Sequence, residues 1–415
     1  MLLWSFSTSD LGLSTTYPAV VRVNPSSSGK TDNTNAKWLM LVGSGPTSYA
    51  GTSSQTAKLF SLDLATGPIN PSTGLSVVTS FPTIDSNAFM GDAISLDLDL
   101  DFRVDSLYGG DAYATGSAPA WAGRMYRLTT GGGSPTLTSW GIASGIERSP
   151  TVLLGTFPQS GTTKVGPVVA APTVTMDDAR NVWLFFGTGR FFSVMDKVNA
   201  DTQHFFGVKD PVATGGCTQL SVSSCEQPDL VNVSGAVVCS ICSGAQVSGV
   251  AGVTTLLGSA TTTLQGLIQS KHGWYTTLPT AGERAVVSPT LLGGIVFFPT
   301  FVPSVDICTA SGSGYLYALF YLTGSAYKDP VIGTEAAGSD TLASRSISLG
   351  TSGLASQMAV HIGGQGSGSS GGGNGSGCVG SVTGFIQSST GTLTQFCTKP
   401  ALGVWSRYIS WLQQS

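Results

Sequence analysis

Charged side chains are scarce in this sequence. Only 10% of the 415 residues are Asp, Glu, Lys or Arg, against about 25% in an average soluble domain. The formal net charge of −4 provides no basic surface, so nucleic acid is not an expected partner. No segment approaches the roughly 18–20 continuous apolar residues that span a bilayer. The sequence therefore argues against a nucleic-acid-binding protein and predicts no transmembrane segment.

The first residues also lack the features of a signal peptide. Residues 1–6, Met-Leu-Leu-Trp-Ser-Phe, contain no basic segment and no long apolar run. We predict that this segment is a strand from its first residue. The chain is then either a fragment of a longer protein or carries its export information elsewhere.

Helical patterns are missing as well, and strand patterns take their place. No long stretch has a convincing 3.6-residue period, whereas glycine occupies 55 positions, roughly twice its usual ~7% share. Short apolar segments recur, each closed by Gly, Asp or Asn, as expected for strands buried on one or both faces. The chain is predicted to be all-β, with strands at Ala19–Val23, Trp38–Val42, Lys58–Leu62, Met125–Leu128, Val182–Phe186, Phe205–Val208, Gly294–Phe298 and Tyr315–Phe320.

A longer repeat connects these strands. The phrase Leu-Phe-Ser-Leu-Asp-x-x-Thr-Gly at 59–67 returns as Leu-Tyr-Ala-Leu-x-x-Leu-Thr-Gly at 316–324, and more weakly at 385–391. Repetition of one strand-turn unit over several hundred residues is typical of a β-propeller. At roughly 40–50 residues per blade the length fits seven or eight blades with insertions, and we predict seven. A pair of β-sandwiches would explain the strands but not the repeated phrase.

Two segments depart from the repeat within a predicted single domain, 1–415. Residues 211–262 carry four cysteines among Ser, Val and Gly, and are predicted to be a disulfide-pinned insertion. Residues 363–377 are almost entirely Gly and Ser. Because that composition buries little apolar surface, a flexible surface loop is expected.

All seven cysteines lie in the C-terminal half. Zinc would need a second ligand pair at a suitable spacing, and Cys-Ser-Ile-Cys at 239–242 is followed by Ser243, so it is not a haem attachment site. In a Gly-rich chain with little charge, disulfides in an oxidising compartment are favoured. We predict the local pairs Cys217–Cys225, Cys378–Cys397 and Cys239–Cys242. The remaining cysteine, Cys308, is then left over or pairs outside the chain.

The segment 95–105, Ser-Leu-Asp-Leu-Asp-Leu-Asp-Phe-Arg-Val-Asp, is chemically the most specific part of the sequence. Its carboxylates occupy positions 1, 3, 5 and 9 of a calcium-loop pattern, with a main-chain carbonyl at position 7. So many carboxylates in a short loop repel one another unless a cation lies among them. Ca²⁺, with six to eight oxygen ligands in flexible geometry, suits them better than Mg²⁺. The predicted ligands are Asp97, Asp99, Asp101, Asp105 and the carbonyl of Arg103.

Two positions differ from an EF-hand. Phe102 stands at position 6, where an EF-hand has Gly, and Tyr108 stands at position 12 in place of a bidentate Glu. A strand-flanked calcium loop is therefore predicted rather than an EF-hand. The alternative is a solvated strand with Leu inward and Asp outward.

At this loop the sequence resembles the PilY/PilC family of secreted proteins found at the tips of type IV pili. Residues 93–111, followed by Gly-Arg-Met-Tyr-Arg at 123–127, are similar to the family's calcium-loop blade. The similarity continues in order along nearly the whole chain, while the family's variable N-terminal half has no counterpart in this sequence. The other similar segments are residues 3–6, 10–13, 17–23, 37–45, 182–190, 202–210, 273–278, 282–286, 297–303, 306–308, 314–319 and 409–414.

The resemblance implies a modified propeller that binds Ca²⁺ and links it to pilus extension and retraction, surface adhesion and twitching motility. It implies the same five calcium ligands. The expected partners are minor pilins of the pilus tip complex and a host or abiotic surface. The expected location is the cell surface at the pilus tip, with outer-membrane association during export. The Arg-Gly-Asp motif of some family members does not occur here.

An enzyme is the main competing class, because propellers also host quinone-dependent dehydrogenases. Those enzymes use adjacent cysteines and a metal, whereas this chain has no adjacent cysteine pair. His204, His272 and His361 are far apart in the sequence, and no Ser-His-Asp or paired-acid arrangement is evident. A non-enzymatic binding protein is therefore predicted. A sugar-binding propeller lectin shares the fold and remains an alternative.

Overall fold

The computed structural model confirms a nearly all-β chain. It describes residues 3–24, 36–69, 72–74, 76–116, 120–130, 140, 142–144, 147–158, 162–210, 226–306, 311–362, 382–399 and 401. In these ranges the only helices are the 3-10 helix η1 (Val194–Lys197) and the α-helix α2 (Leu264–Gln269). The predicted flexible loop at 363–377 lies outside the described residues.

Two compact units make up the chain. The first comprises Met1–Val231, Lys271–Ser288 and Val302–Thr309, and the second comprises Asn232–Ser270, Pro289–Phe301 and Ala310–Ser415. The first unit thus takes in segments from far downstream in the sequence. The number of blades stays a prediction.

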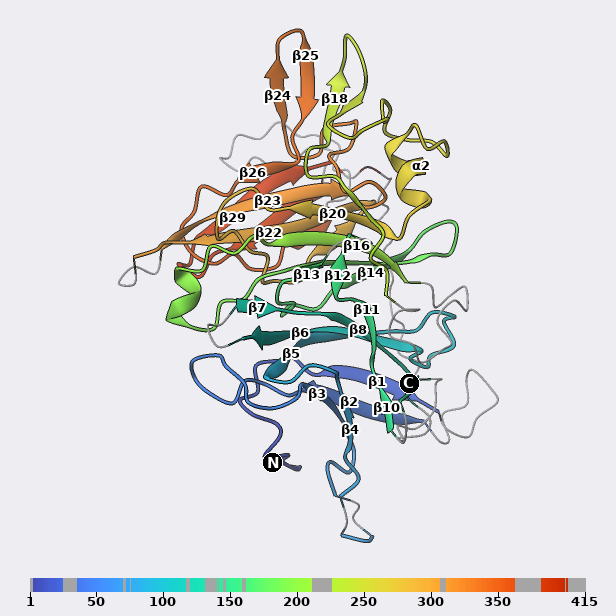
Figure 1. The fold of residues 1–415 in the computed structure, drawn as a ribbon, viewed down its shortest axis with the longest axis vertical. Coiled ribbons are helices and arrows are strands. Elements are labelled where there is room, and N and C mark those ends of the chain that lie inside the picture. Colours follow the sequence, from blue (N-terminus) through green and yellow to red (C-terminus); the bar gives the residue numbers. More distant parts are fainter. Residues whose placement is uncertain are drawn as a thin grey trace, which may run out of the picture. The chain divides into compact units, whose positions relative to one another are not determined.

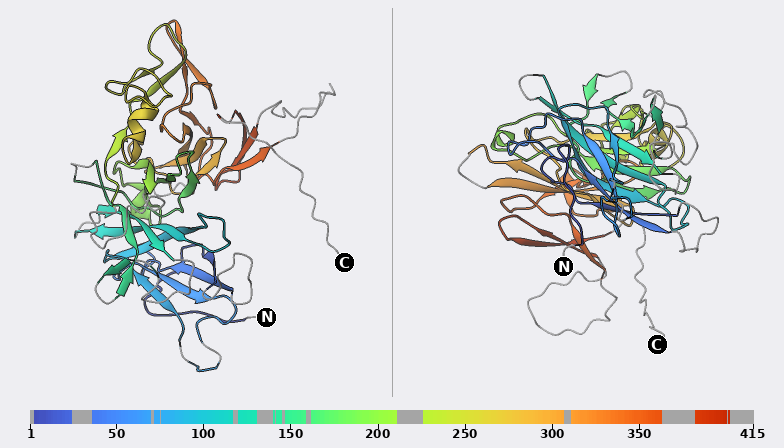
Figure 2. Two further views of the ribbon diagram at one scale, coloured as in Figure 1. Left: turned by 90° about the vertical axis from the view of Figure 1, so that its right-hand side faces the viewer. Right: turned by 90° about the horizontal axis from the view of Figure 1, so that it is seen from below.

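Three antiparallel sheets form most of the first unit, drawn in blue to green in Figure 1 apart from the later strand β20, and seen from two other directions in Figure 2. The first sheet has the order β1 (Ala19–Val23), β2 (Lys37–Gly43), β3 (Lys58–Asp63) and β4 (Thr79–Pro82). The second has the order β11 (Thr151–Leu154), β8 (Met125–Thr129), β6 (Ser106–Thr115) and β5 (Ala88–Leu96), with β7 (Ala120–Ala122) also paired to β6. The third has the order β14 (Thr173–Met176), β15 (Val182–Gly187), β16 (His204–Asp210), β20 (Gly273–Thr277) and β17 (Leu230–Asn232). The pairs β10 (Glu147–Ser149) with β9 (Ile142–Ser144) and β12 (Thr156–Phe157) with β13 (Thr163–Lys164) are shorter.

Strand β6 separates two hydrophobic cores of this unit. Its residues Leu107 and Tyr113 join a core formed with the first sheet, which includes Val21 and Leu41. Tyr108 points to the opposite face and joins a core shared with the third sheet. Successive side chains of a strand alternate between faces, so a strand covered on both sides is buried on both faces. This explains why β6 is buried from Ser106 to Tyr113, including the polar Asp111.

The second unit contains three further antiparallel sheets and α2. One sheet has the order β19 (Val247–Ser248), β18 (Val237–Ile241), β25 (Asp340–Ala343) and β24 (Thr334–Ala337). Another has the order β21 (Thr290–Leu292), β22 (Ile295–Pro303), β23 (Gly312–Phe320) and β26 (Ser346–Ser348). The last has the order β27 (Ala359–Ile362), β28 (Val382–Gln387) and β29 (Leu393–Thr398). The predicted insertion at 211–262 therefore supplies β18 and β19 to a larger sheet of this unit, and β17 to the third sheet of the first unit.

The predicted disulfide Cys239–Cys242 is present. It lies at the end of β18, where the register with β25 shifts between Cys239 and Ile241. Cys397 on β29 is also disulfide-bonded, while its predicted partner Cys378 lies outside the described residues. The predicted pair Cys217–Cys225 and the remaining Cys308 lie outside them too.

The repeated sequence phrase has one local structure at its two strongest occurrences. After β3, the amide of Gly67 donates to the carbonyl of Asp63 at 2.7 Å; after β23, Gly324 donates to Phe320 at 2.8 Å. Both glycines have positive φ, 72° and 61°, which costs Gly little because it has no Cβ. The Thr-Gly of the phrase therefore closes the same turn in both units.

The N-terminal segment differs from the prediction. Residues 3–8 form no strand. The Trp4 indole Nε1–H donates to the carbonyl of Leu64 at 3.1 Å, and the ring of Phe6 packs edge-on against Phe60 with centroids 5.5 Å apart. Aromatic burial, rather than a β ladder, holds this segment to the first sheet.

Candidate metal site

The Asp-rich segment forms the loop between β5 and β6. The strands pair up to Leu96 and Ser106, and the amide of Asp105 donates to the carbonyl of Leu96 at 2.9 Å to close the loop. On the other side, the amide of Val104 donates to the carbonyl of Arg22 on β1 at 3.0 Å. The loop is thus anchored to two sheets of the first unit.

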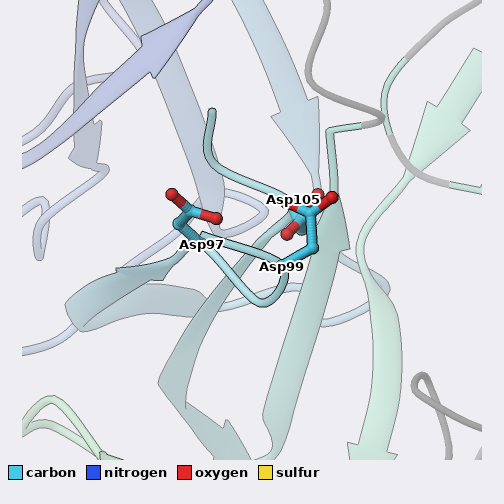
Figure 3. Close-up of side chains that lie close together, drawn as sticks. All are labelled: Asp97, Asp99 and Asp105. Carbon is cyan, nitrogen blue, oxygen red and sulfur yellow. The ribbon is translucent and has the colours of Figure 1, made fainter. Parts of the chain in front are cut away.

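Three of the predicted ligands converge. One carboxylate oxygen from each of Asp97, Asp99 and Asp105 lies within 4.8 Å of the others (Figure 3). Asp97 and Asp105 are half-buried and Asp99 is exposed. A single Ca²⁺ has oxygen ligands at about 2.3–2.6 Å, so oxygens at this mutual separation are close enough to share one ion. The donor set of hard carboxylate oxygens fits calcium.

The loop backbone holds these carboxylates in place. Asp97 accepts hydrogen bonds from the amides of Asp101 at 3.1 Å and Phe102 at 2.8 Å, and Asp99 accepts from Asp101 at 3.1 Å. Asp105 accepts from the amide of Leu98 at 2.7 Å. Short Asp side chains readily form such bonds to nearby amides. The cluster is therefore fixed by the loop's own main chain.

Asp101 is not part of this cluster. Its side chain is buried and accepts from the amide of Arg103 at 2.9 Å and from the guanidinium Nε at 2.7 Å, and the two groups form an ion pair. The hydrogen bond to Asp101 raises the pKa of Arg103. Asp101 thus holds the Arg103 side chain against the loop. The main-chain carbonyl of Arg103 is the fifth predicted ligand.

Electrostatic repulsion within the loop is visible at Asp105. Burial raises the pKa of its carboxyl, and the charges of Asp99, Asp97 and Asp101 raise it further, against the hydrogen bond from Leu98. A cation among the carboxylates would remove this repulsion. The electrostatics of the loop therefore favour a bound cation.

Two residues of the loop adopt the left-handed conformation that glycine usually takes. Leu100 has φ 59° and Phe102 has φ 67°. Phe102 stands where an EF-hand has Gly, and the backbone takes the same kind of turn with a phenylalanine in it. A non-glycine residue in this region costs about 1–2 kcal/mol, which the bonds from Phe102 to Asp97 and from Arg22 to Phe102 offset in part.

A second acidic pair, which the sequence analysis did not single out, consists of Asp111 on β6 and Asp85, which precedes β5. Asp85 accepts from Arg124 Nε at 2.7 Å and from the Tyr126 hydroxyl at 2.5 Å, and Asp111 accepts from the Arg124 amide at 2.9 Å. Burial, followed by the neighbouring Asp85 charge, raises the pKa of Asp111 well above 3.8. The sequence feature that could have pointed to this pair is an Asp in the middle of the largely apolar strand β6.

Asp111→Asn should change how stability depends on pH. The folded chain keeps the Asp111 proton above pH 3.8 while the unfolded chain releases it, so wild-type stability should fall as pH rises from about 4 towards the raised pKa. One such proton contributes a slope of about 1.4 kcal/mol per pH unit. The free energy of unfolding is measured with urea from about pH 4 to about pH 8. Its dependence on pH should be weaker in Asp111→Asn than in Asp178→Asn, the matched variant at an exposed position. Equal slopes would contradict this assignment.

The three histidines do not form a site. His204 packs between aromatic rings, with Phe157 at a centroid distance of 4.9 Å, and burial lowers its pKa to about 4. His272 Nδ1 accepts from the amide of Asp229 at 3.2 Å, and His361 is exposed on β27. Each is explained by packing, local hydrogen bonding or exposure. In the described residues, no helix is long and apolar enough to cross a membrane.

Comparison with known proteins agrees with the predicted resemblance. No protein-family model matches the chain. Two type IV pilus biogenesis factors, both PilY1 homologues of Xylella fastidiosa, are 28% identical over 308 residues and 26% identical over 338 residues. These matches cover 70% and 78% of this chain but only 18% and 22% of the relatives, so the chain spans about a fifth of their length.

The fold has a solved counterpart. The crystal structure of the Pseudomonas aeruginosa PilY1 C-terminal domain superposes with a TM-score of 0.60 and 16% sequence identity. The match covers 96% of this chain and 76% of that domain. The predicted resemblance is therefore confirmed: the chain is a relative of the PilY1 homologues and has the fold of the PilY1 C-terminal domain.

Proposed function

We propose that this chain is a non-enzymatic, calcium-binding module of a type IV pilus biogenesis protein. The convergence of Asp97, Asp99 and Asp105 in one loop carries the calcium assignment. The two curated relatives, named as pilus biogenesis factors, support the pilus role. In this proposal the module acts outside the cell at the pilus tip, where it contacts minor pilins and a surface and influences extension, retraction, adhesion and twitching.

Asp97, Asp99 and Asp105 would hold the ion, with the Arg103 carbonyl as a further ligand. Bound Ca²⁺ supplies positive charge that cancels the repulsion between the carboxylates. In its absence the loop's side chains repel one another, so the segment between β5 and β6 loosens while the sheets stay folded. A local change in order can alter how a partner is engaged without any catalysis.

Calorimetry tests the site directly. The wild-type chain should bind one Ca²⁺ per loop, and extracellular modules often have Kd values of ~10⁻⁴–10⁻³ M. Asp105→Asn removes a ligand charge and should weaken binding at least tenfold, which corresponds to about 1.4 kcal/mol. Asp178→Asn, on the exposed turn between β14 and β15 and outside the three-carboxylate cluster, is the matched control and should bind as wild type does. Unchanged affinity in Asp105→Asn would refute the site.

The pilus role needs the full-length protein in cells. Asp97→Asn combined with Asp105→Asn should alter piliation, twitching and attachment, because the loop can no longer hold the ion. Export and abundance of the variant are measured in parallel. If an exported, stable variant behaves as wild type in all three assays, the loop is structural and the regulatory role fails.

A further inference from the structure

The calcium loop presents two large apolar side chains to solvent. Leu100 is 77% exposed and Phe102 is 63% exposed, and both have left-handed backbone conformations. Asn, Asp or Gly would occupy these positions with less strain and better hydration. An exposed, strained apolar pair is consistent with a binding function.

The neighbouring surface extends this apolar character. Val20 on β1 is 47% exposed and Trp38 on β2 is 54% exposed. Arg22, which lies opposite Trp38 in the strand register, donates through Nη1 to the carbonyl of Phe102 at 2.5 Å. Val20 and Arg22 share one face of β1, because side chains alternate and Val21 between them is fully buried. The loop tip and this strand face are therefore adjacent.

The composition of this surface matches the lipid-water interface. Aromatic and aliphatic side chains flanked by basic ones are typical of elements that lie at a bilayer surface, with the apolar groups in the acyl boundary and the cations beside phosphates. Here Leu100, Phe102 and Trp38 lie beside Arg22, and Arg103 directly follows Phe102 in the loop. A tip of two adjacent exposed side chains can enter a bilayer without a preformed pocket.

Charge makes this insertion conditional on calcium. Asp97, Asp99, Asp101 and Asp105 outnumber Arg103 and Arg22 by two charges, which an anionic bilayer would repel. One Ca²⁺ would neutralise them. With one oxygen from each carboxylate, as in the cluster, three carboxylates and a carbonyl would provide four of the six to eight oxygens that Ca²⁺ takes, and lipid phosphate oxygens could complete the set.

We propose that Leu100 and Phe102 form a membrane-insertion tip, through which this chain binds anionic phospholipid bilayers when its loop holds Ca²⁺. This inference rests on the proposed calcium site and names a partner for it. Without Ca²⁺ the loop is negatively charged and an anionic bilayer repels it. With Ca²⁺ the loop is neutral, and its two apolar side chains can enter the bilayer. The rest of the chain stays outside the bilayer.

Vesicle sedimentation tests the tip. The purified full chain is mixed with vesicles of phosphatidylcholine and about one third phosphatidylserine, in about 1 mM Ca²⁺ or in chelator. Wild type should sediment only with Ca²⁺. Leu100→Ser with Phe102→Ser should lower vesicle affinity at least tenfold, because two large apolar side chains no longer leave water. Met195→Ser with Val305→Ser, equally exposed apolar positions of the same unit, should bind vesicles as wild type does.

Calorimetry on the same samples separates this inference from the calcium site. The double serine variant should keep wild-type Ca²⁺ affinity, since neither side chain is a ligand. A wild-type chain without bound Ca²⁺ would refute the site itself. Normal Ca²⁺ binding with no sedimentation, or with equal sedimentation of the serine variant, would overturn the lipid proposal alone. Calcium-dependent self-association without vesicles, lost in the serine variant, would assign the tip to a protein partner instead.

Discussion

Arg127→Met should lower the free energy of unfolding by about 3–5 kcal/mol, because it leaves a buried carboxylate without its counter-charge. Arg127 on β8 forms an ion pair with Asp210 at the end of β16, and both side chains are almost completely inaccessible to solvent, with 2% and 0% exposed. The pair thus joins the second and third sheets of the first unit. Methionine approximates the length of the arginine stem but cannot compensate the Asp210 charge.

The double variant Arg127→Met with Asp210→Leu is the informative control. Removing both charges avoids the unpaired carboxylate, so urea unfolding should show recovery of much of the lost stability. The exposed pair Lys328–Asp329 provides a comparison, since Lys328→Met should leave the urea unfolding midpoint close to that of wild type. If Arg127→Met proves as mild as Lys328→Met, the buried pair is not a major contributor.

Gly207→Ala should destabilise the third sheet by about 3 kcal/mol, near the upper end for overpacking. Gly207 on β16 pairs with Trp274 on β20. A Cβ at Gly207 would lie 2.3 Å from Trp274 Cε2 and 2.6 Å from Nε1. The indole is fully buried, so it cannot move away without displacing the core around it.

Thermal and urea unfolding measure this effect, with Gly244→Ala as the matched control. A Cβ at Gly244 would meet nothing within 4 Å, so this variant should unfold at the wild-type midpoint or slightly above it. An alanine at position 207 that left the midpoint unchanged would show that β16 and β20 can separate freely at this point.

Strand positions were largely predictable from the sequence, because burial on one or both faces gives a short-range pattern. The segment Ala19–Val23 was predicted with the bounds that β1 has, and Val182–Phe186 lies within β15. Sheet membership was not predictable in this way. Strand β20 joins β16 from far downstream, and no local pattern specifies such pairing. The N-terminal segment misled for a related reason: Trp4 and Phe6 are apolar because they pack on the first sheet, not because they extend it.

The sequence predicted which residues belong to the candidate site, but it did not predict in full which of their carboxylates come together. Spacing placed four aspartates in one loop, and three of them converge. Asp101 departs because Arg103, two residues further on, offers a guanidinium within reach, and the spacing of carboxylates carries no information about such a competing partner. The exposure of Leu100 and Phe102 could not be read from the sequence either, since the spacing of the aspartates predicts a loop but not which of its apolar side chains face solvent.

The late position of β20 has a consequence for the order in which the chain can fold during synthesis. Strand β16 exposes one edge from the moment it forms, and the strand that covers that edge begins only at Gly273, after the whole segment containing β18, β19 and α2 has been made. An uncovered edge bearing aromatic residues such as Phe205 and Phe206 is a template for pairing with other chains. A nascent chain stopped anywhere between these strands would therefore be prone to aggregation, and fragments intended for study should extend beyond Thr277.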